Sequence, residues 1–249
     1  MKVKRHFKAN ELLKKKRPED FGLKYTSSQR IELKEKLIID TEEEEVCLVV
    51  IGGKADFQFK NKKGMANFKD MIYIPRKKKI QLYSKDAVII YFSAPSNIDT
   101  QFSLLKFLDV DKNPDMHKIV GSLENNCKRD VWKFIDSDFN ASRLMIGLCE
   151  GYVGGWTSWP PHEHAEKREE VYVYFNMKNS FGIQCVYDDM NNPYDVSLVT
   201  DGDLISIPKG YHPNVGCPAG KISYIYCMAS KKPGERNFMD MNIQKIYNK

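Results

Sequence analysis

The stretch Gly155-Trp-Thr-Ser-Trp-Pro-Pro-His162-Glu-His164 decides how the rest of this sequence is interpreted. The chain has five histidines, and two of them lie here, one residue apart. Successive side chains of a strand point to opposite faces, so His162 and His164 would lie about 7 Å apart on one face while Glu163 points away. The two prolines before them would end the preceding segment and fix the start of this strand. The pattern predicts a metal site that other strands complete.

A second motif, Gly202-Asp-Leu-Ile-Ser-Ile-Pro208-Lys-Gly210-Tyr-His212, would bring a third histidine back to the same place. Gly202 allows a tight turn, Pro208 ends the strand, and Gly210 allows the bend that directs His212 toward the site. Three imidazoles and one glutamate form a mixed nitrogen and oxygen set. Such a set suits a divalent transition metal, for which we expect Zn, Mn or Fe.

Two adjacent glutamates, Glu169 and Glu170, begin the strand that follows the histidine pair, and either could complete the set. Glu169 would share a face with Val171 and Val173, so the pattern alone favours Glu169 as the inward-facing residue. Glu170 would share a face with the next two tyrosines, whose hydroxyls suit a polyol pocket. The residues alone leave the choice open.

Short apolar runs separated by Gly, Pro, Asn and Asp recur along the chain, which indicates an all-β sandwich or barrel. The best helical candidate is a short segment near residues 8–16. Glu44-Glu-Val-Cys-Leu-Val-Val50 parallels residues 169–175, and Asp70-Met-Ile-Tyr-Ile-Pro75 parallels residues 203–208. We therefore predict a duplicated β-unit, with an N-terminal domain at residues 1–125 and a C-terminal domain at residues 126–249. The first copy has Lys79 where the second has His212, so we expect metal in the C-terminal domain alone.

Composition and charge restrict the kinds of binding partner that we expect for this chain. The net charge is +6, but residues 1–17 contribute +7, from eight Lys and Arg against Glu11. We interpret that segment as a solvated terminus rather than a nucleic-acid-binding surface. No apolar run approaches the roughly 20 residues that span a bilayer, and the N-terminus does not resemble a secretory signal. None of the six cysteines forms a Cys-x-x-Cys pair, which favours free, buried thiols. We expect a cytoplasmic protein that binds neither nucleic acid nor membrane.

Residues 155–164, 169–174 and 201–213 resemble the two signature motifs of the cupins. The similarity is closer to the bicupin isomerase family of 5-deoxy-glucuronate isomerase, an enzyme of myo-inositol catabolism, to which 5-keto-4-deoxyuronate isomerase is related. The resemblance implies two double-stranded β-helix (jelly-roll) barrels. It also implies that Glu170 is the acidic ligand, so that the metal would be held by His162, His164, Glu170 and His212. The loop between His164 and Glu170 is shorter and more charged than expected for the family, which leaves the exact substrate open.

The resemblance further implies a metal-dependent aldose–ketose isomerase that converts 5-deoxy-glucuronate to 5-dehydro-2-deoxy-gluconate. Such a reaction needs a Lewis acid for the substrate oxygens and a base that moves a proton. Lys209 and Tyr211 flank His212 and are our candidates for the catalytic residues. A sugar acid also needs a cation for its carboxylate, for which the sequence offers Arg129, Arg143 and Arg168 without choosing among them.

Two other functions fit the same motifs. One is a different cupin enzyme on the same metal, such as a uronate isomerase or a dioxygenase. The other is a non-catalytic sugar-binding cupin. Barrels with edge strands often pair, so a homo-oligomer is also expected.

Overall fold

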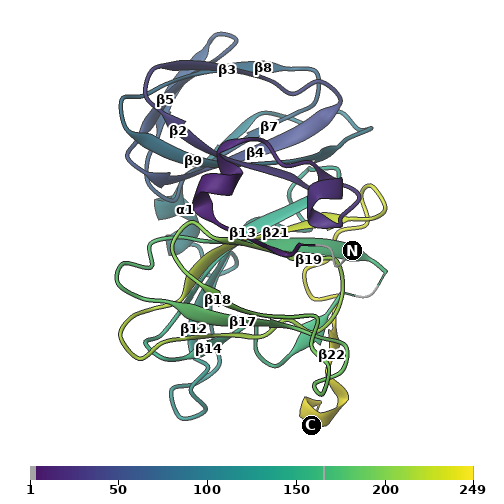
Figure 1. The fold of residues 1–249 in the computed structure, drawn as a ribbon. Coiled ribbons are helices and arrows are strands. Elements are labelled where there is room, and N and C mark those ends of the chain that lie inside the picture. Colours follow the sequence, from purple (N-terminus) through teal and green to yellow (C-terminus); the bar gives the residue numbers. More distant parts are fainter. Residues whose placement is uncertain (1–3, 165, 249) are drawn as a thin grey trace.

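The computed structural model describes residues 4–164 and 166–248, which form two β-barrels stacked on each other (Figure 1). Each barrel is a sandwich of two antiparallel sheets, so the molecule has four layers of sheet. The predicted all-β fold with two jelly-roll barrels is confirmed. Within the described residues, no helix is both long and apolar enough to cross a membrane.

The first barrel pairs a five-stranded sheet with a four-stranded one. The five-stranded sheet has the order β10-β7-β4-β9-β2, from β10 (Ser103–Leu105), β7 (Met71–Ile74), β4 (Glu44–Gly52), β9 (Ala87–Pro95) and β2 (Ser27–Leu33). The four-stranded sheet has the order β3-β8-β5-β6, from β3 (Lys36–Asp40), β8 (Lys79–Tyr83), β5 (Ala55–Phe59) and β6 (Lys62–Ala66).

The second barrel pairs a seven-stranded sheet with another four-stranded one. The seven-stranded sheet has the order β1 (His6–Phe7), β19 (Leu204–Ile207), β16 (Arg168–Tyr174), β21 (Ser223–Ser230), β13 (Leu144–Gly151), β12 (Arg129–Ile135) and β11 (His117–Val120). Facing it, the four-stranded sheet has the order β14 (Trp156–Thr157), β20 (Asn214–Gly216), β17 (Gly182–Val186) and β18 (Asp195–Val199). A two-stranded pair, β15 (His162–Glu163) with β22 (Asn242–Ile243), lies beside them.

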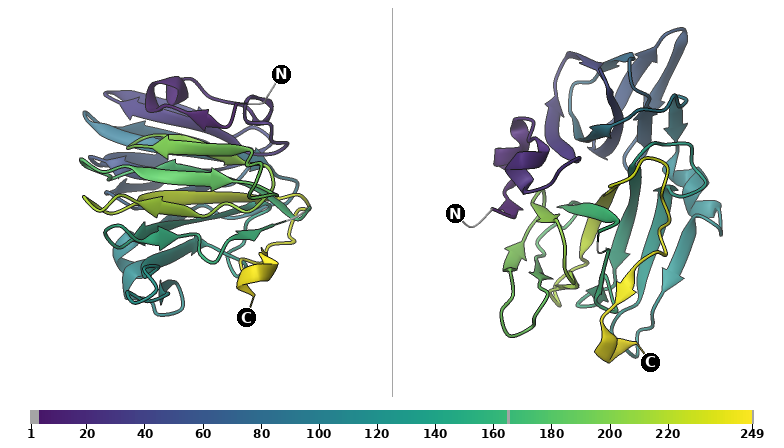
Figure 2. Two further views of the ribbon diagram at one scale, coloured as in Figure 1. Left: turned by 60° about the horizontal axis from the view of Figure 1, so that its bottom comes forward. Right: turned by 90° about the vertical axis from the view of Figure 1, so that its right-hand side faces the viewer.

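The strand alternation explains why the two large sheets stack back to back. In β4, Val46 and Leu48 point into the first barrel, while Cys47 and Val49 join the core between the barrels. In β16, Val171 belongs to that same shared core. Strands buried on both faces need apolar residues at nearly every position, which is what the continuous runs in the sequence supply. Figure 2 shows the resulting stack of layers.

Two segments of the predicted N-terminal domain pair with strands of the second barrel. Strand β1 pairs with β19 of the second barrel, and the 3-10 helices η1 (Ala9–Leu13) and η2 (Pro18–Phe21) follow it. The basic terminus is therefore packed rather than merely solvated, since Leu12 is fully buried and Lys8 forms an ion pair with Asp203. A short helix, α1 (Phe107–Lys112), lies before the predicted boundary, and β11 after it already pairs with β12. The division at residues 125 and 126 stays a prediction, and this pairing favours a boundary before β11.

The register of the strands corrects our alignment of the two copies. Met71 and Leu204 follow the Asp in the two matching motifs. Met71 pairs with Val49 in the first barrel, and Leu204 pairs with Val173 in the second. The copies of this strand are thus offset by 124 residues (173 minus 49), whereas our sequence alignment used 125. Val46 is consequently the first-barrel counterpart of Glu170. The first barrel therefore has an aliphatic side chain where the second barrel has Glu170. Lys79, which our alignment placed opposite His212, forms an ion pair with Asp40.

Candidate metal centre

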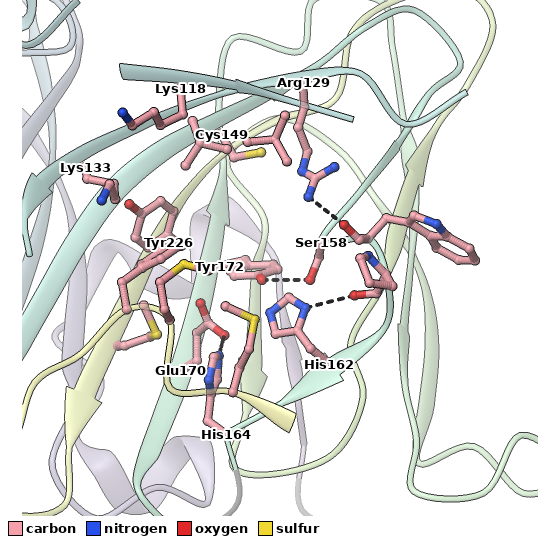
Figure 3. Close-up of a pocket in the computed structure, with 18 of the residues that line it drawn as sticks. Lys118, Arg129, Lys133, Cys149, Ser158, His162, His164, Glu170, Tyr172 and Tyr226 are labelled. Carbon is pink, nitrogen blue, oxygen red and sulfur yellow. Dashed lines mark hydrogen bonds and ion pairs between the residues drawn. The ribbon is translucent and has the colours of Figure 1, made fainter. Parts of the chain in front are cut away.

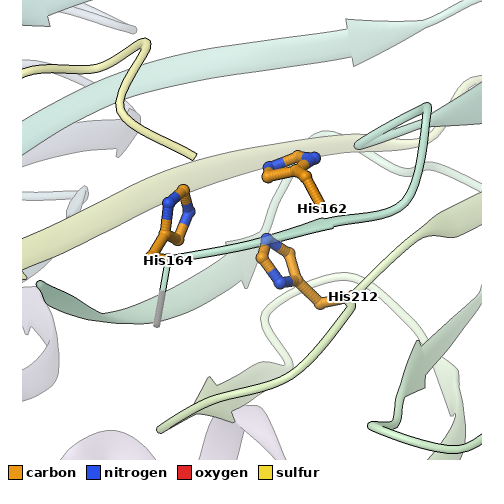
Figure 4. Close-up of side chains that lie close together, drawn as sticks. All are labelled: His162, His164 and His212. Atoms are coloured by element: carbon orange, nitrogen blue, oxygen red, sulfur yellow. The ribbon is translucent and has the colours of Figure 1, made fainter. Parts of the chain in front are cut away.

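Three histidines meet at one end of the second barrel (Figure 4). His162 lies on β15, His164 follows it, and His212 lies in the loop between β19 and β20. One ring nitrogen from each histidine lies within 4.8 Å of the other two. The ring centroids of His162 and His212 are 4.7 Å apart. The structure therefore brings the two predicted histidine motifs together, and this triad could hold a metal ion.

Backbone carbonyl groups fix how two of these imidazoles present their nitrogens. His162 Nδ1 lies 3.0 Å from Pro160 O, and His212 Nδ1 lies 2.8 Å from Gly210 O. A carbonyl oxygen can only accept, so Nδ1 carries a proton in both rings, and Nε2 is the nitrogen left to face the site. This is the arrangement that metal-binding histidines commonly show, with the second nitrogen held by a hydrogen bond.

Glu170 points at the same place from β16. Its Oε2 lies 3.2 Å from His164 Nε2 and 3.1 Å from His212 Nε2. Burial would raise the pKa of Glu170, but the neighbouring imidazoles outweigh that effect and hold the pKa well below its usual range. Burial also lowers the pKa of His162 to about 3, helped by the other two histidines. The site therefore combines the Glu170 carboxylate with the neutral imidazole of His162.

Glu169, the other candidate, points the opposite way. Its carboxylate accepts hydrogen bonds from the backbone N–H groups of Lys24, Tyr25 and Thr26 and from the Thr26 hydroxyl, at 2.8–2.9 Å. The face with Val171, which pattern alone favoured, is the interface between barrels. Sequence reasoning could not see this because both faces of β16 are buried.

A cavity of about 380 Å³ opens beside the histidines (Figure 3). Its lining includes four residues that carry hydroxyl groups, Ser158, Tyr172, Tyr224 and Tyr226. Ser158 Oγ and Tyr172 Oη are 3.2 Å apart. Burial raises the pKa values of these three tyrosines well above their usual range, so they stay neutral hydroxyl donors. These hydroxyls suit a polyhydroxylated ligand.

The C-terminal segment covers one side of this cavity, which the sequence did not predict. Phe238, Met239, Met241 and Ile243 all line it. Strand β22 pairs with β15, so Ile243 lies directly opposite His162. The ring of Tyr247, farther along, packs on Trp159 at 5.0 Å. In Figure 2 this segment, in yellow, runs along the second barrel. No motif marks it, because its contacts with the site form only in the folded chain.

The structure does not bring our two catalytic candidates into the cavity. Lys209 is exposed, with its Nζ 3.0 Å from Asp188 Oδ2. Tyr211 pairs with Tyr187 through a β-bridge, and their rings lie 5.7 Å apart. Neither occurs among the described residues that line the cavity. Their assignment as catalytic residues stays a prediction that this geometry does not support.

The three candidate arginines occupy different places. Arg129 lies in the cavity wall, on β12. Arg143 donates to the carbonyl groups of Ser230 and Lys231, away from the cavity. Arg168 is buried next to two methionine sulfur atoms and lines a separate surface pocket. Of these three arginines, Arg129 is the one that lines the cavity beside the histidines.

Comparisons with known proteins place this geometry in a family. The KduI/IolB family matches residues 1–246. The chain belongs to the KduI/IolB family. A protein named 5-deoxy-glucuronate isomerase from Halalkalibacterium halodurans is 29% identical over 228 residues, which cover 82% of this chain and 80% of that protein. One of the same name from Shouchella clausii is 34% identical over 150 residues, 57% of this chain and 52% of that protein.

Solved structures support the same fold. An IolB-like protein from Salmonella typhimurium LT2 superposes with a TM-score of 0.82, at 19% identity over 98% of both chains. A cupin 2 conserved barrel domain protein from Leptotrichia buccalis gives a TM-score of 0.56 at 14% identity, over 93% of this chain and 98% of that one. These similarities show the fold and confirm the predicted bicupin architecture of this KduI/IolB family member.

Proposed function

We propose that the chain is a metal-dependent aldose–ketose isomerase that converts 5-deoxy-glucuronate to 5-dehydro-2-deoxy-gluconate in inositol catabolism. Membership of the KduI/IolB family and the name shared by its relatives support this activity. The cavity supports it as well, because Ser158 and Tyr172 line it next to the carboxylate–imidazole cluster, which fits a sugar derivative. A catalytic base is not assigned.

One observation carries the metal assignment. One ring nitrogen from each of the three histidines lies within 4.8 Å of the other two, and Glu170 Oε2 lies 3.2 Å from His164 Nε2 and 3.1 Å from His212 Nε2. Four ligand atoms that converge in this way in a buried site are the arrangement that binds a transition-metal ion. Among the described residues, His164 Nδ1 is also buried without a hydrogen-bond partner. We infer that His162, His164, Glu170 and His212 hold the metal, with Zn, Mn or Fe as the ions that suit this donor set.

The bound metal would supply a Lewis acid for the substrate oxygens in the step that moves a proton between adjacent carbons. The chain's own residues orient the substrate for that step. Tyr172 and Ser158, whose hydroxyls are hydrogen-bonded to each other, line the cavity beside the histidines. Phe238 and Met241 of the C-terminal segment cover the cavity with apolar surface, which excludes water and strengthens polar contacts inside.

Turnover by the metal-loaded protein tests this proposal. We expect the purified protein to convert 5-deoxy-glucuronate to the ketose, with activity lost on chelation and restored by Zn, Mn or Fe. In D₂O, NMR should follow both the product and solvent exchange at the reacting carbons. The His212→Ala variant should lose both metal and activity. A wild-type protein that carries stoichiometric metal but turns over no sugar acid would contradict the proposal.

The two alternatives predict different results in the same preparation. A dioxygenase consumes oxygen during turnover, whereas the isomerase reaction does not. A non-catalytic sugar-binding cupin would be stabilised thermally by the sugar acid and form no product. Self-association and cytoplasmic location stay predictions.

A further inference from the structure

Three cationic side chains share one face of β12 and its neighbour β11, the edge strand of the seven-stranded sheet. On β12, Arg129, Val131 and Lys133 alternate with residues that face the core between the barrels, so all three point into the cavity. On β11, Lys118 lies directly opposite Val131. Lys118 therefore sits diagonally between Arg129 and Lys133. We call Arg129, Lys118 and Lys133 the cationic wall.

Like charges placed this closely on one sheet face are destabilising unless an opposite charge balances them. Asp136 offsets part of the wall, because it lies 2.9 Å from Lys133 Nζ. Glu170, the acid that lines the cavity among the described residues, is engaged with the histidines. The wall thus leaves positive charge facing a cavity that is otherwise lined by aromatic and apolar groups. Packing does not require such a wall, but an anionic ligand does.

Arg129 is the best-defined group of the wall. It is 9% exposed, so its position is set by the protein. Its Nη1 donates to Cys127 O at 2.9 Å, and its Nη2 donates to Trp159 O at 2.6 Å. A guanidinium has five N–H donors, so these two bonds orient the fork and leave donors for a carboxylate. Both partners are neutral carbonyl groups, so its charge stays available.

The wall and the metal ligands occupy different ends of the cavity. Figure 3 shows Arg129 and Lys118 at one end and Glu170 and His164 at the other, with Tyr172 between them. A ligand that touches both ends must carry an anion at one end and metal-binding oxygens at the other. A sugar acid with its carbonyl and carboxylate at opposite ends of the carbon chain meets this requirement.

We propose that the cationic wall is the carboxylate-binding subsite of this cavity, with Arg129 as the principal contact. This inference rests on the proposed function and adds to it the orientation of the substrate. The carboxylate lies against β11 and β12, and the aldehyde end faces the three histidines. Neutral sugars of the same size leave Arg129 without an anion and bind less tightly.

Binding of defined probes tests the subsite without turnover. Calorimetry on the metal-loaded protein would compare D-glucuronate with D-glucuronamide, which replaces the carboxylate by a neutral amide, and with glucose 6-phosphate. We expect wild type to prefer glucuronate to glucuronamide. The Arg129→Met variant should reduce this preference about 10- to 100-fold, because it removes a charge-assisted hydrogen-bonding pair. Lys118→Met, at an exposed position, should reduce it about two- to fivefold.

A matched control and a metal assay separate the outcomes. Lys63→Met makes the same charge change on β6 of the first barrel and should leave the preference unchanged. Arg129 also holds the carbonyl of Trp159, so metal content is measured for each variant. If the Arg129→Met protein has lost its metal, the Lys118→Met protein is the deciding variant. An unchanged preference in the deciding variant, or tighter binding of glucose 6-phosphate than of glucuronate, would overturn the subsite. If glucuronate preference depends on Arg129 but no isomerisation is found, the subsite stands and the proposed function fails.

Discussion

Replacing either of two neighbouring glutamates should have opposite consequences. The Glu169→Gln variant keeps the shape of the side chain but turns an amide group toward N–H donors. The wild-type carboxylate accepts from three backbone N–H groups and one hydroxyl of residues 24–26, which tie the first unit to the second. Breaking a buried, charge-assisted network of this kind costs about 3–5 kcal/mol. For a chain of this length, that lowers Tm by roughly 6–20 °C.

The matched variant is Glu170→Gln, one residue along the same strand. It changes the same charge but faces the histidines, so it should lose bound metal, whereas Glu169→Gln should keep it. Thermal unfolding of metal-free protein, followed by circular dichroism, reports the first effect. Elemental analysis after reconstitution reports the second. A Glu169→Gln protein that loses metal without losing stability would refute our assignment of the two faces of β16.

Further predictions concern other parts of the chain. Glu45, whose buried carboxylate accepts from the N–H groups of Ser142, Arg143 and Leu144, is the counterpart of Glu169; Glu45→Gln should lower Tm by a similar amount and leave metal content unchanged. Lys209→Ala should change kcat and KM less than about threefold in steady-state assays, since surface ion pairs contribute little; a hundredfold loss of kcat would restore it as a catalytic candidate. Deleting residues 238–249 should leave circular dichroism unchanged but lower kcat/KM at least about tenfold, because the cavity loses its apolar cover. Hydrogen bonds from His6, Lys8 and Thr200 outweigh burial and hold the pKa of Asp203 below its ordinary 3.8. Asp203→Asn should therefore lower the free energy of unfolding, measured in urea above pH 4, by about 1–2 kcal/mol. This difference should shrink as the pH falls through the lowered folded-state pKa.

Much of this fold could be predicted from residue patterns. The short runs between Gly, Pro, Asn and Asp gave the β-class, and the repeated Asp-x-Ile-x-Ile-Pro motif identified two copies. The histidine triad was also predictable, because His162, His164 and His212 sit beside prolines and glycines that fix the chain locally. These signals are local, so they survive without knowledge of the tertiary structure.

The parts that could not be predicted depend on contacts between distant segments. Both faces of β16 are buried, so apolar neighbours could not show that Glu169 faces the other barrel. The same ambiguity shifted our alignment of the copies by one residue. Lys209 and Tyr211 were chosen because they adjoin His212, but the bend at Gly210 that turns His212 inward leaves Lys209 exposed. The wall of Arg129 and Lys118 is formed by strand pairing, which no sequence motif marks.

Anomalous diffraction from crystals of the metal-reconstituted protein tests the central claim most directly. Data collected on either side of the absorption edge of the bound metal would locate the ion and identify it. We predict one strong peak per chain in the second barrel, in contact with His162, His164, Glu170 and His212, and none beside Val46 in the first. A peak that does not contact Glu170, or fully reconstituted crystals with no peak at the three histidines, would contradict the account.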